Sequence, residues 1–205
     1  MQNSQRQLGR PRKDPNELST KDTILQIATV LFLEKGYPLI SMDDVAQRAD
    51  VTKATVYYHY RTKDDLFTDA VVKLMERITG GIEKIFANDM PLKEKLHTLA
   101  YAHLRATANM DVNLFMKEAR HSLSEEHEKQ LKDSEDQMYR ALEKGIQKAM
   151  DAGEIPQSNA YLSSLLFMSM LIIGKNNEKS FDTLNDIVSQ TIDFFWDGLA
   201  NQKSK

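Results

Sequence analysis

The sequence predicts an all-α fold. Apolar residues recur at helical spacing along most of the 205-residue chain, and no segment shows the regular alternation of a half-buried strand. Glycine and proline residues such as Gly36, Gly153 and Pro156 fall where these helices are expected to end. We therefore expect about nine helices, divided between a small N-terminal domain and a larger C-terminal domain.

The composition is that of a folded globular protein, with 41% hydrophobic and 28% charged residues and only 5 prolines. The chain has no cysteine, which excludes disulfide bonds and thiolate chemistry. Its N-terminus lacks an apolar signal core, and its longest apolar run, residues 161–173, contains three serines and is too short to cross a bilayer. We expect a cytoplasmic protein that has no membrane partner.

Positive charge is concentrated at the N-terminus, although the whole chain has a formal net charge of −3. Residues 1–13 contain four basic residues and no acidic residue. The segment Gly9-Arg10-Pro11-Arg12-Lys13 is similar to part of an AT-hook, in which arginines enter a narrow minor groove of DNA. We predict that residues 1–19 form a basic arm whose Arg10, Arg12 and Lys13 contact DNA, the alternative being a solubilising tail.

Three helices are predicted between residues 20 and 66. The first runs from about Thr20 to Gly36, with apolar residues at helical spacing on one face. The second begins at Ser41, whose hydroxyl forms a capping box with Asp44, and a third short helix follows it. Three such helices in fewer than fifty residues predict a separate small domain at 20–66.

The last two of these helices form a helix-turn-helix. They are joined by the turn Ala49-Asp50-Val51, and Thr52 can cap the second helix. In this motif the second helix enters the major groove of DNA, whose width suits one α-helix. Asp50 tolerates the left-handed conformation of such a turn better than most residues do.

Three stretches within residues 20–66 form one pattern: Ser41-Met42-Asp43-Asp44-Val45-Ala46, then Val51 to Tyr60, and then Lys63-Asp64-Asp65-Leu66. This pattern resembles the signature of the TetR family of bacterial regulators. The resemblance implies that the following residues face the major groove: Thr52, Lys53, Ala54, Thr55 and Tyr57. It implies that three more hold phosphates: Tyr58, His59 and Lys63. Asp43 lies near the same surface and would repel phosphate unless it is paired.

The tyrosines of this segment have an alternative interpretation as core aromatics of a small bundle. Three successive helical residues cannot all point at one core, so Tyr57, Tyr58 and His59 cannot be buried together. We expect Tyr60 to be the buried member of the group.

Residues 67–205 are predicted to form a helical ligand-sensing and dimerisation domain. The helices expected from residue 64 onward are 64–87, 91–109, 112–121, 124–151, 158–173 and 181–199. The last two carry broad apolar surfaces, and in TetR-like proteins such helices pack against their copies in a second subunit. The expected contact residues are Leu165, Met168, Ile172, Leu184, Ile187, Val188, Ile192 and Phe195. The alternative is that both helices serve one intramolecular core.

Methionines and aromatic residues between these elements predict a cavity for a small, largely apolar effector, since methionine adapts to apolar ligands. The candidate lining residues are Tyr101, Leu104, Met110, Phe115, Met138, Phe167 and Met168. The alternative for each of them is ordinary core packing.

Two adjacent glycines, Gly80 and Gly81, lie within the helix predicted for 64–87. Each costs a helix interior about 1 kcal/mol relative to alanine. The pair therefore marks either a loose helix end or a kink through which a ligand could swing the helix.

These features together predict a transcriptional repressor that binds palindromic double-stranded DNA as a homodimer and is released by a small-molecule effector. A helical metal enzyme is an alternative, because Glu118 and His121 have the spacing of a Glu-x-x-His metal helix. The sequence has no second such motif, so we expect no catalytic residue, no metal and no cofactor. A protein-binding adaptor is the third possibility.

Overall fold

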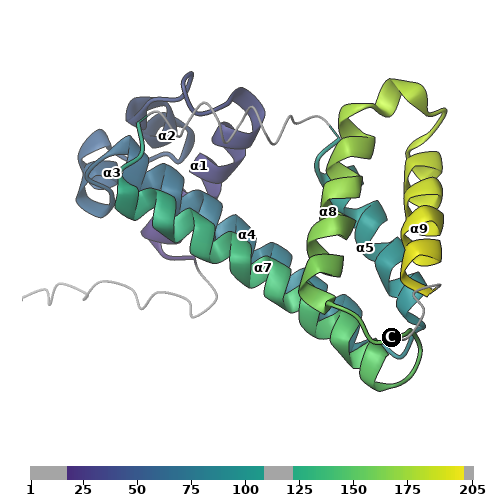
Figure 1. Cartoon of the computed structure of the whole chain (residues 1–205). Coiled ribbons are helices and arrows are strands. Elements are labelled where there is room, and N and C mark those ends of the chain that lie inside the picture. Colours follow the sequence, from purple (N-terminus) through teal and green to yellow (C-terminus); the bar gives the residue numbers. More distant parts are fainter. Residues whose placement is uncertain (1–17, 109–121, 201–205) are drawn as a thin grey trace, which may run out of the picture.

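The computed structural model describes residues 18–108 and 122–200, and all regular structure in these residues is helical, as predicted. The first three helices lie at one end of an elongated molecule, and α5, α8 and α9 lie at the other (Figure 1). Two long helices, α4 and α7, run side by side between the ends. The bounds are α1 Thr20–Lys35, α2 Met42–Arg48, α3 Lys53–His59, α4 Lys63–Ala87, α5 Leu92–Ala106, α7 Glu125–Asp151, α8 Ala160–Asn176, the 3₁₀ helix η1 Glu178–Ser180, and α9 Leu184–Ala200.

Most predicted helix ends agree with the structure to within three residues, and the helix predicted for 112–121 lies outside the described residues. α8 continues past its predicted end at Ile173, through Gly174 to Asn176. A Cβ on Gly174 would lie 2.8 Å from the side chain of Ile187, so the glycine allows α9 to pack closely against α8. α9 begins at Leu184, and Thr183 and Asp186 cap its first turn. The Thr183 amide donates to the Asp186 carboxylate, and the Asp186 amide donates to the Thr183 hydroxyl.

Buried side chains form two clusters. The N-terminal cluster joins α1 to α3 with the first half of α4, and its rings Phe32 and Phe67 meet edge to face at 5.2 Å. The C-terminal cluster joins α5, α8 and α9 with the second halves of α4 and α7. Met75 of α4 packs against both clusters, and Leu131 of α7 belongs to the N-terminal one. The predicted domain boundary after residue 66 therefore falls inside α4, which serves both clusters.

α4 and α7 approach each other closely at Gly145. A Cβ on this glycine would overlap the ring of Phe86, so only glycine lets the ring lie against the backbone of α7. Gly80 and Gly81 are different, because a Cβ on either would meet no atom of the described residues within 4 Å. They lie inside α4, which continues to Ala87, so the interpretation of the pair as a loose helix end is wrong.

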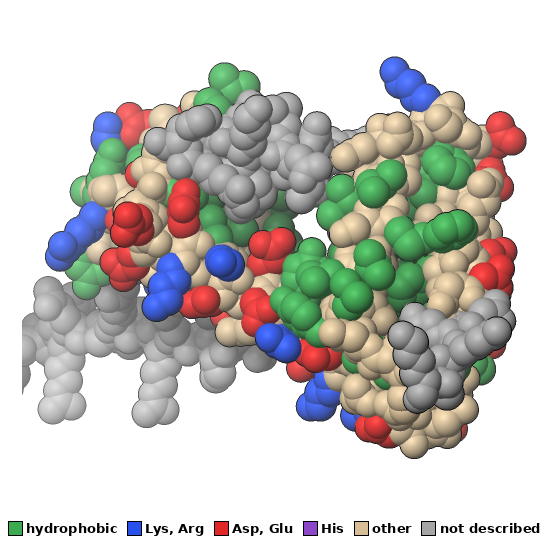
Figure 2. Space-filling view, in the orientation of Figure 1, with side chains coloured by type: hydrophobic (Ala, Val, Ile, Leu, Met, Phe, Trp, Pro, Cys, Tyr) green, Lys and Arg blue, Asp and Glu red, His purple; other side chains and the backbone are tan. Residues whose placement is uncertain are grey.

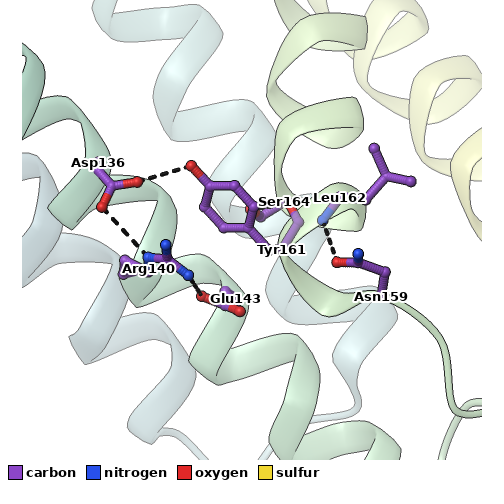
Figure 3. A network of polar contacts seen from close by, with 7 residues as sticks. All are labelled: Asp136, Arg140, Glu143, Asn159, Tyr161, Leu162 and Ser164. Atoms are coloured by element: carbon purple, nitrogen blue, oxygen red, sulfur yellow. Dashed lines mark hydrogen bonds and ion pairs between the residues drawn. The ribbon is translucent and has the colours of Figure 1, made fainter.

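A polar network holds α8 against α7 (Figure 3). The hydroxyl of Tyr161 donates a hydrogen bond to Asp136 at 2.8 Å, and the guanidinium of Arg140 lies 4.3 Å from the centre of the Tyr161 ring. Arg140 also bonds Asp136 and Glu143, at 3.4 and 3.0 Å. Because Tyr161 faces α7, the next residue, Leu162, is turned outward and is half exposed.

The two kinds of glycine give a stability prediction. Gly145→Ala is expected to lower the free energy of unfolding by about 1–3 kcal/mol, because the methyl group overlaps the Phe86 ring. Gly80→Ala, the matched control, is expected to raise it by up to about 1 kcal/mol, because the methyl enters open space in a helix. Urea denaturation followed by circular dichroism measures both. Equal stability of the two variants would show that α7 does not depend on this close approach.

Candidate nucleic-acid interface and ligand cavity

The helix-turn-helix forms as its local signals predict. Ser41 and Asp44 make a complete capping box at the start of α2, and the Thr52 side chain accepts a hydrogen bond from the Thr55 amide at the start of α3. Asp50 has a φ of 53°, the left-handed conformation expected in the turn. The Val51 amide then donates to the Ala46 carbonyl at 3.0 Å, which closes the turn.

One face of α3 is exposed within the part of the chain that the structure describes. Val56 is fully buried and anchors the helix, whereas Tyr57 and Tyr58 on the other side are 43% and 84% exposed. Of the eight residues predicted to contact DNA in this region, five are exposed and Thr55, His59 and Lys63 are partly so. This geometry agrees with a helix whose outer face enters a groove.

Tyr60 is the buried member of the aromatic group, as expected, with 4% of its surface exposed. Its hydroxyl donates to Asp69 at 3.0 Å, and the ammonium of Lys21 lies 5.3 Å from the centre of its ring. Burial, together with the charge of Asp69, raises the pKa of Tyr60. Tyr60 therefore joins the end of α3 to α1 and α4.

Asp43 forms an ion pair, which is the condition under which its carboxylate would not repel a phosphate. Its carboxylate bonds the ammonium of Lys53 at 2.8 Å, and this hydrogen bond raises the pKa of Lys53. Both side chains are about 60% exposed, and exposed ion pairs contribute about 1 kcal/mol or less. A phosphate can therefore replace Asp43 as the partner of Lys53 at little cost.

Lys63, the first residue of α4, is held by an aromatic ring that the sequence analysis did not single out. Its ammonium lies 4.1 Å from the ring centre of Tyr37 and donates to the Pro38 carbonyl at 3.4 Å. Burial lowers the pKa of Lys63. The hydroxyl of Tyr37 bonds Asp64, and burial with this bond raises the pKa of Tyr37 to about 12.

α7 contacts the same helix start. Nε2 of His127 lies 3.1 Å from Oδ1 of Asp65, and the other oxygen of Asp65 accepts the Thr62 amide in the capping box of α4. Asp65 therefore joins the first turn of α7 to the first turn of α4. Because only three residues separate the end of α3 from the start of α4, the position of α3 is tied to α7.

A cavity of about 280 Å³ lies between α4, α5, α7 and α8, with Leu33 of α1 at its N-terminal side. Its walls are almost wholly apolar, and its polar side chains are His103, Thr107, Glu135 and Tyr139. The apolar and glycine residues that line it are Leu33, Val71, Leu74, Met75, Ile78, Gly81, Ile82, Ile85, Leu99, Ala102, Ala106, Met138, Met168 and Ile172.

Two of the predicted lining residues, Met138 and Met168, line this cavity. Leu104 and Phe167 are fully buried in the C-terminal cluster instead, and Tyr101 is 39% exposed outside the cavity. The predicted residues Met110 and Phe115 lie outside the described residues, as do Arg10, Arg12 and Lys13 of the arm.

The prediction missed the contribution of α4 to the cavity wall. The signal for it was an apolar series at intervals of three and four residues along that helix: Val71, Leu74, Met75, Ile78, Ile82 and Ile85. The series continues beyond the residues of α4 that the N-terminal cluster buries. The helix therefore has further apolar side chains that can line a cavity.

The predicted subunit contacts on α8 and α9 differ in their burial within one chain. Five of them are buried within one chain, because α8 and α9 pack on each other and on α5, and they have almost no surface left for a partner. These five are Met168, Ile187, Val188, Ile192 and Phe195. Leu165, Ile172 and Leu184 are partly exposed.

The same two helices expose a different apolar set, which we call the outer face: Leu162, Leu166, Ile173 and Phe194, each at least half exposed. Figure 2 shows hydrophobic side chains gathered over α8 and α9 on the side turned toward the viewer. Both helices therefore serve an intramolecular core and also carry an exposed apolar face.

Comparison with known proteins gives two family matches. Residues 24–70 match the family model for bacterial regulatory proteins, tetR family, and residues 89–173 match the tetracyclin repressor-like C-terminal domain. The chain belongs to the TetR family of bacterial regulators. A TetR-family protein is a transcriptional regulator and not an enzyme, which confirms that expectation.

Two curated relatives are regulators of the same type. The chain is 29% identical over 104 residues to the HTH-type transcriptional regulator YhgD of Bacillus subtilis, over 50% of this chain and 54% of YhgD. It is 39% identical over 51 residues to IcaR of Staphylococcus epidermidis, a negative transcriptional regulator of a biofilm operon, over 25% of this chain and 28% of IcaR. The matches thus span about half of the first relative and about a quarter of the second.

A solved structure shows the same fold. FadR of Bacillus subtilis, crystallised in complex with stearoyl-CoA, has a TM-score of 0.68 and 17% identity, over 89% of this chain and 99% of that chain. Within the ranges 18–108 and 122–200, no helix is long and apolar enough to cross a membrane. The same ranges contain no group of three metal-ligating side chains, and the Glu118 and His121 pair lies outside them.

Two substitutions test the predicted DNA-binding surface of this TetR-family protein. Lys63→Ala is expected to weaken binding to all DNA sequences and to reduce the slope of log Kd against log salt by about one unit, because one phosphate contact is lost. Tyr57→Ala is expected to weaken binding and also to change sequence preference. Titration of labelled DNA at several salt concentrations measures both effects.

Lys84→Ala, on an exposed position near the far end of α4, is the control and is expected to bind normally. Unfolding of the N-terminal helices by Tyr57→Ala, with unchanged DNA affinity per folded molecule, would show that Tyr57 supports the fold instead of contacting DNA.

Proposed function

We propose that this protein is a homodimeric repressor that binds a palindromic operator through α3 of each subunit and is released by a small, largely apolar effector. The observation that carries the proposal is the exposed face of α3 on a completely capped helix-turn-helix, with Lys53, Tyr57, Tyr58 and Lys63 at its surface or edge. The relative IcaR, a negative regulator, favours repression over activation. A DNA-bound regulator acts in the cytoplasm, where the chromosome lies.

The outer face of α8 and α9 supports dimerisation. Isolated apolar side chains on a surface are ordinary, but four on two adjacent helices form a patch that a copy of the same patch can cover. A two-fold dimer also supplies two copies of α3, which a palindrome requires at one DNA turn, about 34–36 Å apart. The basic arm, with Arg10, Arg12 and Lys13, would extend the contact into flanking minor grooves.

The position of the cavity supports release by an effector. Leu33 and Val71 at one side belong to or pack against the N-terminal cluster, and Leu99 and Met168 at the other belong to the C-terminal cluster. A molecule bound here contacts both halves of the protein directly. It can therefore favour a separation of the two α3 helices that does not fit the operator.

A palindromic fragment from upstream of the protein's own gene tests the proposal. The protein is expected to bind it as a dimer, with an affinity that falls steeply with salt. Leu166→Glu is expected to give monomers and to weaken binding to the full palindrome at least tenfold, because a buried unpaired carboxylate opposes association. Sedimentation velocity and DNA titration measure both properties.

Gln130→Glu, which adds the same charge at an exposed position of α7, is the control and is expected to remain dimeric. Tight, salt-dependent binding by a Leu166→Glu protein that is still dimeric would place the subunit contact elsewhere. Salt-independent binding, or none, would favour the adaptor alternative.

A second test concerns the glycine pair in α4. An effector has to favour the released state by about 2.7 kcal/mol to weaken operator binding a hundredfold. Stiffening α4 with Gly80→Ala and Gly81→Ala is expected to leave operator binding intact and to reduce release by an effector, measured as the concentration for half release.

Gly80→Ala alone separates stiffening from a change in the cavity wall, because only Gly81 lines the cavity. Full release of the double variant at the wild-type effector concentration would show that α4 does not bend at this pair.

A further inference from the structure

Three polar side chains in the cavity wall have hydrogen-bonding groups that the described part of the chain leaves without a partner. They are the imidazole of His103 on α5 and, on α7, the carboxylate of Glu135 and the hydroxyl of Tyr139. The fourth polar residue, Thr107, is different, because its hydroxyl donates to the His103 carbonyl of its own helix at 2.9 Å. Three groups with free bonding capacity thus face an otherwise apolar space.

Of these three groups, one is negatively charged and two are neutral. Burial lowers the pKa of His103, so the imidazole is neutral at pH 7. Burial and the nearby Glu135 raise the pKa of Tyr139, so the phenol is neutral as well. Among the described lining residues, Glu135 is the charged one, and no lysine or arginine stands with it. The described wall is therefore apolar with one negative charge.

We propose that the effector is an amphiphilic cation, whose ammonium head binds at Glu135 and whose apolar body fills the cavity between α4, α5 and α8. This inference rests on the proposed function, in which the cavity is the effector site, and it adds the charge of the effector. The exposed position of Glu135 places the head at the mouth of the cavity. The buried Leu99, Met138 and Met168 surround the body.

The chemistry of the wall distinguishes the three possible head charges. An ammonium group donates hydrogen bonds to the Glu135 carboxylate and can stand against the ring of Tyr139. A neutral hydroxyl can bond the same groups without the charge attraction. A carboxylate head would lose water and meet Glu135 with no described cation to balance it, which costs binding energy.

The size of the cavity also restricts the effector. Ligand pockets in proteins occupy about 300–1,000 Å³, and this cavity of about 280 Å³ lies at the small end of that range. A single short apolar chain or a small ring system fits such a volume. Although FadR shares the fold, the stearoyl-CoA of its complex is large and anionic, so the described wall of this cavity is unsuited to that class of ligand.

A set of probes that differ only in the head group tests the inference. Decylamine, decanol and decanoate are titrated into the full-length dimer at pH 7, with calorimetry for affinity and operator release as a second readout. The amine, protonated at this pH, is expected to bind about threefold or more tighter than the alcohol, the effect of one partly exposed ion pair. The decanoate ion is expected to bind most weakly.

Glu135→Gln isolates the carboxylate. It is expected to remove the preference for the amine over the alcohol and to leave decanol affinity unchanged, because the amide keeps the shape and loses the charge. Asp133→Asn is the matched control, since it removes an exposed carboxylate from the same helix outside the cavity wall, and it is expected to keep the preference.

Several outcomes would overturn the inference: decanoate binding as tightly as the amine, equal effects of the Glu135 and Asp133 variants, or no binding of any probe. If all three probes bind equally and release the operator, the proposed function stands and only the charge assignment fails. If they bind with the expected preference but never release DNA, the charge assignment stands and effector control at this cavity fails.

Discussion

The packing of α4 against α7 is the contact on which the rest of the structure depends. The two helices run in the same direction, since His127 meets Asp65 near the start of both and Gly145 meets Phe86 near the end of α4. Each contributes buried residues to both hydrophobic clusters. The separation and tilt of this pair therefore set where the three N-terminal helices stand relative to the C-terminal cluster, and a protein interior packed at normal density cannot change that relation gradually.

The cavity lies along the same pair of helices, which gives the proposed effector control a physical basis. Ile78 and Ile82 of α4 and Met138 of α7 all line this cavity. In the proposed mechanism a shift of either helix there would reach the first turn of α4, because Asp65 both bonds α7 and caps α4. The path from this turn to the proposed DNA-binding face is short. Lys63, which lies on the ring of Tyr37, begins the same turn, and α3 immediately precedes it in the chain.

The N-terminal helix-turn-helix was predictable in detail from the sequence, because its determinants lie within a few residues of one another. The capping box of Ser41 and Asp44, the left-handed turn at Asp50 and the burial of Tyr60 follow from local hydrogen bonding, backbone sterics and helical periodicity. The capping box and the turn need no contact far along the chain. The same local logic indicated an unbroken succession of helices and the family resemblance.

The cavity and the outward side of α8 depended on contacts between distant residues. Leu104 and Met138 both belong to the C-terminal cluster, yet only Met138 also lines the space that five helices enclose together. Likewise, the apolar pattern of α8 does not say which residues face out, and the bond from Tyr161 to Asp136, 25 positions away, turns Met168 inward and Leu166 outward. The sequence by itself determined the fold class and the helix-turn-helix, because both depend on local periodicity and helix caps. Only tertiary packing decided which residues line the cavity and which are exposed. The sequence of a nearly all-apolar helix such as α8 does not show which of its sides is buried.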